Sequence, residues 1–153
     1  MESVWDYPRP PRLERSAARV TVVHAGVTVV DSDRCRRVLE TSHPPVFYVP
    51  RDDVAPGVLT PGRGRSVCEF KGVASYWDLV AGDTRVPAAA WSYEDPTPAF
   101  AALAGAVAFY PGRVDECRVD GEQVRAQEGD FYGGWITAGI VGPFKGAPGT
   151  TGW

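Results

Sequence analysis

SVCEFKGVASYWDL, residues Ser66 to Leu79, is the stretch of this chain whose pattern is most typical of one structure. From Val73 onward, successive side chains alternate between two faces, which is the period of a β-strand. Lys71-Gly72 marks a bend just before this run. We therefore predict two paired strands, Arg65 to Phe70 and Val73 to Val80, and expect the rest of the chain to be organised around them.

Short β-branched runs separated by turn residues recur on both sides of this stretch. RVTVVH (19–24) and VTVVD (27–31) flank Ala25-Gly26, a two-residue loop of the kind that joins hairpin strands. CRV (117–119) and EQV (122–124) flank Asp120-Gly121, the clearest hairpin signal in the chain. Further strands are predicted at 46–49, 88–93 and 106–110. The sequence thus predicts a mainly β, compact antiparallel domain of two sheets.

A short helix is expected after the first hairpin. Ser32 offers a side-chain oxygen as an N-cap, and Val38-Leu39 lie at helical spacing from Cys35. These signals predict a helix of about two turns that ends before the following prolines. The helix would place Glu40 and His43 at its exit.

The remaining segments are predicted to form a short helix, a loop, an N-terminal arm and a C-terminal coil. Residues 97–103 are predicted as a second short helix, and PGVLTPGRG (56–64) as a loop. Residues 1–16 are rich in proline and arginine but carry aromatic side chains, so we expect an extended N-terminal arm. It would lie on a single β-rich domain formed by residues 17–153. Residues 129–153 combine glycines with aromatic anchors, which predicts an ordered coil packed on the sheets.

The composition argues against several classes of function. The 153 residues carry a net charge of -3 with both signs interspersed, so we expect no nucleic-acid partner. No apolar run reaches the roughly 20 residues of a membrane helix, and the first residues lack a secretory signal pattern. We therefore expect a cytoplasmic protein without a membrane partner, and a homodimer is compatible with the sequence.

Metal and cofactor sites are not expected. The three cysteines, Cys35, Cys68 and Cys117, include no Cys-x-x-Cys pair, and the chain has two histidines. Asp52-Asp53 is not accompanied by the phosphate-binding loop that usually belongs to a magnesium site. We predict reduced thiols, no bound metal and no cofactor.

Glu40, His43 and Lys71 are the candidates for catalysis. A carboxylate three residues before an imidazole can orient the ring or exchange a proton with it, as general acid–base chemistry requires. Lys71 is one of only two lysines in a chain that otherwise uses arginine, which indicates a need for a compact point charge. The alternative is structural: Glu40 caps local backbone groups, and His43 packs in the Pro44-Pro45 corner.

A second set of side chains is predicted to bind a ligand. Ser66 and Cys68 precede the bend, and Cys68 would be a nucleophile if Lys71 lowered its pKa, although free cysteines are more often small buried hydrophobes. Aromatic side chains with polar tips suit a concave site for a planar ligand, or else they fill the core between two sheets. The aromatic candidates are Tyr48, Tyr76, Trp91, Tyr93 and Trp135.

Several longer motifs, in chain order, resemble the domain-of-unknown-function 427 (DUF427) family. They are ETSHPPVFYVPRDDV, CEFKGVASYWDL, AWSYEDP, FYPGRVD with DGE, FYGGWIT and GPFKGAPGTTGW. The resemblance implies a bacterial protein with a β-tent-like arrangement of two antiparallel sheets. Family members have been labelled nucleotidyltransferases, but this chain lacks the Gly-Ser turn and spaced carboxylates of that chemistry. Glu69 departs from the family pattern, which more often has proline after the cysteine.

We therefore expect a small-molecule-binding β-domain with an aromatic-lined pocket for a small planar or anionic metabolite. The alternative is a cofactor-independent enzyme, a hydrolase, cyclase or isomerase, in which Glu40 and His43 exchange protons. Our sharpest prediction from the sequence is that Glu40, His43, Tyr48 and Lys71 meet in one cleft.

Overall fold

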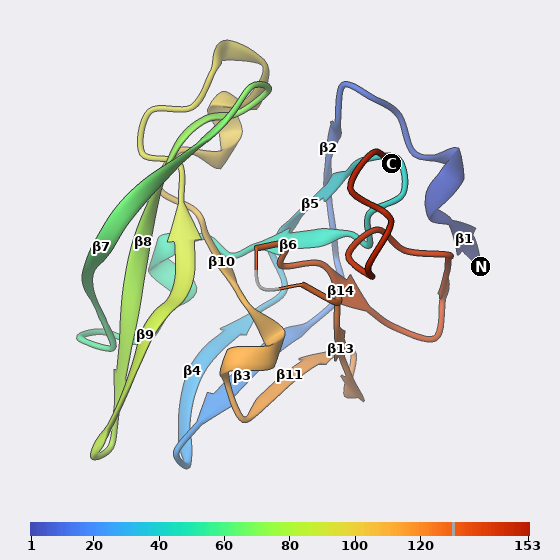
Figure 1. The fold of residues 1–153 in the computed structure, drawn as a ribbon. Coiled ribbons are helices and arrows are strands. Elements are labelled where there is room, and N and C mark those ends of the chain that lie inside the picture. Colours follow the sequence, from blue (N-terminus) through green and yellow to red (C-terminus); the bar gives the residue numbers. More distant parts are fainter. Residues whose placement is uncertain (130) are drawn as a thin grey trace.

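The computed structural model describes residues 1–129 and 131–153, and it shows a mainly β chain with several sheets (Figure 1). One four-stranded sheet has the order β10 (Val107–Phe109), β9 (Thr84–Ser92), β8 (Gly72–Ala81), β7 (Leu59–Cys68). A second has the order β12 (Glu122–Gln123), β11 (Glu116–Val119), β3 (Val20–His24), β4 (Val27–Ser32). A three-stranded sheet contains β2 (Arg12–Arg15), β5 (Arg36–Leu39) and β6 (Val46–Tyr48). The prediction of a mainly β, antiparallel fold is confirmed, but the sheets number more than two.

Two further strand pairs are short. Strand β13 (Arg125–Ala126) pairs antiparallel with β14 (Trp135–Ile136), and β1 (Glu2–Ser3) pairs parallel with β15 (Ile140–Val141). The predicted C-terminal coil therefore contains two short strands, and the predicted N-terminal arm contains β1 and β2. Both termini lie on the same side of the molecule (Figure 1), where the rings of Trp5 and Trp153 meet edge to face at 5.2 Å.

The predicted strand pair around the Lys71-Gly72 bend is present and longer than expected. Strand β7 starts at Leu59, so residues 59–64 of the segment predicted as a loop lie within the strand, and Leu59 to Pro61 pair with β8. The pairing register shifts between Pro61 and Arg65, and this irregularity absorbs the glycines without ending the strand. The loop prediction was wrong because turn-forming residues also occur inside an irregular outer strand.

The two hairpins predicted from their turn residues are confirmed. Strands β3 and β4 pair across Ala25-Gly26, and β11 and β12 pair across Asp120-Gly121. All four turn residues have positive φ, between 49° and 83°. That conformation matches the right-handed twist of the flanking strands, which explains why these local signals were reliable.

The prediction of two short helices is not borne out. The first falls on strand β5, which pairs with β2 on one side and β6 on the other. The Ser32 hydroxyl donates to Asp53 at 2.6 Å and accepts from the Arg34 amide, so it closes a turn and caps no helix. Strand partners far away in the sequence outweigh the local helical spacing here.

The second predicted helix is the six-residue 3-10 segment η3 (Pro98–Leu103), which is kinked at Phe100. The other helical segments of the described chain are single 3-10 turns: η1 (Val4–Asp6), η2 (Arg51–Asp53) and η4 (Pro111–Arg113). Among the described residues, no helix is long and apolar enough to cross a membrane.

The core contains two main clusters of buried side chains, because successive side chains along a strand point to opposite faces. Phe47, Ala90 and Val107 point into the larger cluster, which fills the space between the two four-stranded sheets. Their neighbours Tyr48 and Trp91 point the opposite way into a second cluster. The second cluster also contains Val38, Ala74, Tyr93, Phe100, Leu103, Ala108 and Tyr110. The candidate site lies beside this second, aromatic-rich cluster.

Candidate functional site

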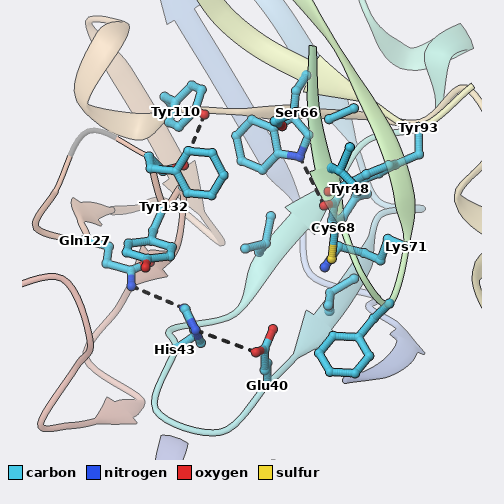
Figure 2. A pocket seen from close by; sticks show the side chains of 18 of the residues that line it. Glu40, His43, Tyr48, Ser66, Cys68, Lys71, Tyr93, Tyr110, Gln127 and Tyr132 are labelled. Carbon is cyan, nitrogen blue, oxygen red and sulfur yellow. Dashed lines mark hydrogen bonds and ion pairs between the residues drawn. The ribbon is translucent and has the colours of Figure 1, made fainter. Parts of the chain in front are cut away.

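A cavity of about 270 Å³ opens beside the second cluster (Figure 2). Its lining comes from the turn before β6, from strands β6 to β9, and from segments after residue 126. All the site residues selected from the sequence line this cavity, with the exception of Trp135. Those that line it are Glu40, His43, Tyr48, Ser66, Cys68, Lys71, Tyr76, Trp91 and Tyr93.

Trp135 belongs to the core and does not line the cavity. Its side chain is completely buried in the larger cluster, 5.1 Å from the ring of Phe47. The indole N–H donates to the Phe109 carbonyl at 3.1 Å. The aromatic pattern could not separate these two environments, because a buried tryptophan with a satisfied N–H suits either.

Glu40 and His43 are the two ends of a tight turn and do not leave a helix. The His43 amide donates to the Glu40 carbonyl at 3.0 Å, and Ser42 between them has a φ of 70°. The turn brings the two side chains together, with 3.8 Å between His43 Nε2 and a Glu40 carboxylate oxygen. The same oxygen lies 3.3 Å from Arg9 Nε, so the carboxylate also faces a cation outside the cavity.

His43 is neutral at neutral pH. Burial lowers the pKa of His43 to about 4, because the imidazolium loses its hydration. The Glu40 carboxylate raises the pKa in part, whereas the charges of Lys145, Arg9 and Lys71 lower it further. Gln127 Nε2 lies 3.4 Å from His43 Nδ1, on the side of the ring away from Glu40 (Figure 2).

Lys71 is buried without a partner of opposite charge. Only 8% of the residue is exposed, and no hydrogen bond or ion pair links its ammonium group to any described residue. Its Nζ lies 5.8 Å from the centre of the Tyr93 ring and 5.8 Å from the centre of the Phe100 ring. The bend that carries Lys71 is anchored by the Thr97 amide, which donates to the Lys71 carbonyl at 3.0 Å.

Lys145 is the second cation of the cavity lining. Its Nζ lies 5.3 Å from the centre of the Tyr132 ring, and its amide donates to the Ser42 carbonyl at 2.9 Å. That backbone bond holds the C-terminal segment against the turn that carries His43. The only two lysines of the chain, both in the tripeptide Phe-Lys-Gly, therefore line the same cavity.

One wall of the cavity consists of aromatic side chains that order one another. Trp91 Nε1 donates to the Tyr48 hydroxyl at 3.2 Å, and the rings of Trp91 and Tyr110 lie 4.6 Å apart. The Tyr76 hydroxyl donates to Ser66 Oγ at 2.8 Å. Burial raises the pKa of Tyr48, of Tyr93 and of Tyr110, so these phenols remain uncharged at neutral pH.

The three cysteines have different environments. Cys68 is half-buried and lines the cavity, whereas Cys35 and Cys117 are buried in the larger core cluster. Burial raises the pKa of Cys35 to about 11 and that of Cys117 to about 12. These two thiols therefore stay protonated and fill space.

The lining residues that were not selected from the sequence include Tyr110, Gln127, Tyr132 and Lys145. The last three come from the C-terminal part of the chain, where glycine-rich composition obscures periodicity. The rarity of lysine was a signal for Lys145, as it was for Lys71, because the chain has only these two lysines. Gln127 carried no local signal.

The described residues contain no group of three or more His, Cys, Asp or Glu side chains placed to hold a metal ion.

A model of the family described as a domain of unknown function (DUF427) matches residues 12–120 of the chain. No curated protein matches it. The matched region carries the turn with His43, the Lys71 bend and the aromatic wall, and it ends before the C-terminal lining residues.

Proposed function

Because this chain belongs to the DUF427 family, whose description names no activity, we propose from the cavity itself that the protein binds a small planar anion. The observation that carries the proposal is the unpaired ammonium group of Lys71. A cation that is partly withdrawn from water loses hydration unless an opposite charge or hydrogen bonds replace the lost water. An anionic ligand in the cavity would supply that partner.

The acidic residues of the lining do not cancel the two lysines. Glu40 faces Arg9 outside the cavity, and Glu69 is exposed to solvent. The buried phenols are uncharged, and so is His43 at neutral pH. The interior of the cavity is therefore electropositive, and it selects ligands with negative charge.

The aromatic wall of the cavity is the reason for proposing that the ligand is planar. Trp91, Tyr93 and Tyr110 are held by contacts with one another and with Tyr48, so their rings are ordered before any ligand arrives. Ordered rings bind planar molecules at low entropic cost, because few side-chain rotations remain to be lost. A planar ring that carries a carboxylate combines both requirements.

Benzoate and benzamide test the proposal, because they share a ring and differ in charge. Calorimetric titration of the wild-type protein should give a benzoate affinity at least tenfold higher than that of benzamide. Lys71→Met should lower the benzoate affinity about tenfold or more, since a hydrogen bond to a charged group contributes roughly 1.5–3 kcal/mol. The melting temperature should change little, because the substitution removes a cation that makes no hydrogen bond or ion pair with any described residue.

The control is Arg63→Met, which removes an exposed cation that does not line the cavity. This variant should bind benzoate as the wild type does. Equal binding of benzoate and benzamide, or unchanged binding by Lys71→Met, would refute the proposal.

A cofactor-independent enzyme is the second candidate, and the position of Glu40 favours it. Its carboxylate is in the cavity lining, 3.8 Å from a neutral imidazole, where it can accept a proton from a bound molecule. Phenylpyruvate is a suitable probe, because it combines an aromatic ring and a carboxylate with an exchangeable methylene proton. We propose that the protein accelerates deuterium exchange at this carbon in heavy water, and that Glu40→Gln abolishes the acceleration while phenylpyruvate still binds.

A further inference from the structure

Gln127 is the most constrained polar side chain beside the cavity. It follows strand β13, only 5% of it is exposed, and its amide group contacts three different segments of the chain. The Oε1 atom accepts from the Gly134 amide at 3.1 Å, and Nε2 donates to the Lys145 carbonyl at 2.7 Å. The third contact is the one with His43 Nδ1 at 3.4 Å.

The two backbone partners define which end of the amide is which. If the amide were reversed, its NH₂ group would face the Gly134 N–H and its oxygen would face the Lys145 carbonyl. Both contacts would then place like partners together, donor against donor and acceptor against acceptor. The NH₂ group of Gln127 must therefore be the end that faces His43.

This arrangement depends on close approach by two glycines. A Cβ on Gly134 would lie 2.5 Å from Gln127 Oε1, and a Cβ on Gly146 would lie 2.0 Å from the Glu128 carbonyl oxygen. Any side chain at either position would push the backbone away from Gln127. The backbone thus holds the amide in place before any ligand binds.

We propose that Gln127 is a positioning residue: its NH₂ group donates to His43 Nδ1 and thereby fixes the neutral ring as the tautomer that carries its proton on Nε2. A neutral imidazole has one N–H, and an amide NH₂ group can only donate. Because Nδ1 is occupied as an acceptor, the proton must reside on Nε2. His43 therefore serves the cavity as a hydrogen-bond donor and not as a proton acceptor.

The other charged groups around His43 are consistent with this tautomer. The Glu40 carboxylate lies 3.8 Å from Nε2, beyond hydrogen-bond distance, so its negative charge favours a proton on Nε2 and leaves the N–H free to donate to a ligand. Lys145, Arg9 and Lys71 are positive, and each of them disfavours the imidazolium form. The Tyr132 ring, whose centre is 5.2 Å from that of His43, packs against the imidazole and carries no charge.

This inference rests on the proposed function and narrows its ligand class. The His43 Nε2–H and the ammonium groups of Lys71 and Lys145 are all donors, so the ligand needs several acceptor oxygens on one group. A carboxylate meets that need, and a thiolate or halide does not. Benzoate affinity should also stay constant between pH 6 and 8, because no histidine in the site has to become charged.

Nitrogen-15 NMR of the imidazole rings tests the tautomer without any ligand. The wild-type spectrum at pH 7 should show an unprotonated Nδ1 and a protonated Nε2 for His43. His24, whose Nδ1 accepts from the Asp115 amide, provides an internal reference, and its signals are identified by their loss in His24→Gln. A wild-type spectrum with the proton on Nδ1 would overturn the inference.

Substitutions at Gln127 provide a second test of the His43 tautomer. In Gln127→Glu, a carboxylate replaces the NH₂ group, so His43 should move its proton to Nδ1 or become an imidazolium with a raised pKa. Gln123→Glu makes the same charge change at an exposed position and should leave the His43 spectrum unchanged. Gln127→Met keeps the size of the side chain but removes the donor, and it should give a mixture of tautomers. An unchanged spectrum in both Gln127 variants would contradict the assignment.

The two proposals fail separately. If His43 shows the expected tautomer but benzoate does not bind, the binding function is wrong and the positioning role stands. If benzoate binds and the proton is on Nδ1, the positioning role is wrong and the binding function stands.

Discussion

Asp78 and Lys71 are almost equally buried, at 9% and 8% exposure, but only Asp78 has charged and polar partners among the described residues. Its carboxylate accepts from the Ala88 amide at 2.9 Å and from Arg85 at 2.8 Å. These bonds lower the pKa of Asp78, the backbone donor contributing most. Asp78 thus has the partners that a structural charge needs, and Lys71 does not; this contrast is why we propose a ligand-binding role for Lys71.

His43 should make the stability of the protein depend on pH. Its pKa of about 4 in the folded state is below the ordinary value of 6.5, so the unfolded chain binds the proton more readily. The free energy of unfolding is therefore highest above pH 6.5 and falls as the pH decreases towards 4. Between pH 7.5 and 5 we expect a loss of about 2 kcal/mol from this group.

Urea denaturation of the wild type and of His43→Gln at a series of pH values measures this effect. Carboxylates whose pKa is lowered in the folded state, such as Asp31 and Asp53, lose their contribution at lower pH and are common to both proteins. The decline between pH 7.5 and 5 should be smaller in His43→Gln. Parallel curves for the two proteins would show that the imidazole is not the cause.

At the scale of elements, residues 131–134, which precede β14, close one side of the cavity against strand β9. It can do so because residue 133 is a glycine: a Cβ there would lie 2.2 Å from the Trp91 ring. The Tyr110 hydroxyl donates to the Phe131 carbonyl at 3.1 Å and fixes the same segment. The glycine-rich composition of this region thus serves close packing, and the region is ordered for that reason.

Gly133→Ala should therefore destabilise the protein by about 1–3 kcal/mol, the usual cost of forcing an extra group into a packed interior. Gly139→Ala is the matched control, because a Cβ at Gly139 would meet no atom within 4 Å. Chemical denaturation followed by tryptophan fluorescence measures both variants. A Gly133→Ala protein as stable as Gly139→Ala would mean that the segment does not pack on Trp91.

At the scale of the whole molecule, the two ends of the chain depend on each other. Strand β1 pairs with β15, the Trp5 indole donates to the Pro143 carbonyl at 2.8 Å, and Tyr7 packs in a third cluster with Phe144. Beyond residue 128, the chain also contributes the fully buried Trp135 to the larger core cluster. The C-terminal segments are therefore part of both the core and the cavity wall.

Removal of residues 129–153 should abolish cooperative unfolding. The truncated chain would lose Trp135 from the core and would expose the apolar groups that it covers, at a cost of roughly 3–5 kcal/mol for that side chain alone. Thermal circular dichroism and near-ultraviolet spectra measure the loss. Removal of Trp153 alone is the control and should change the melting temperature only slightly, because it takes away one edge-to-face ring contact. A truncated protein that melts cooperatively at the wild-type temperature would contradict this prediction.

The sequence by itself determined the features that depend on neighbouring residues. Alternation along 73–80 gave the central strand, and Ala25-Gly26 and Asp120-Gly121 gave two hairpins, because positive φ is a local property of the turn. Nine of the ten site residues selected from the sequence also line the cavity, and several of them, such as Glu40 with His43 and Ser66 with Lys71, lie close together in sequence.

Only the tertiary structure decided what depends on distant partners. Residues 36–39 are a strand because β2 and β6 pair with them, although their spacing suits a helix. Trp135 is in the core and Trp91 lines the cavity, since their strands, β14 and β9, belong to different sheets and place the two side chains in different clusters. Gln127 reaches His43 across 84 positions of sequence. Local sequence patterns reflect interactions between residues a few positions apart. Long-range contacts such as these depend on how the sheets bury their apolar faces together.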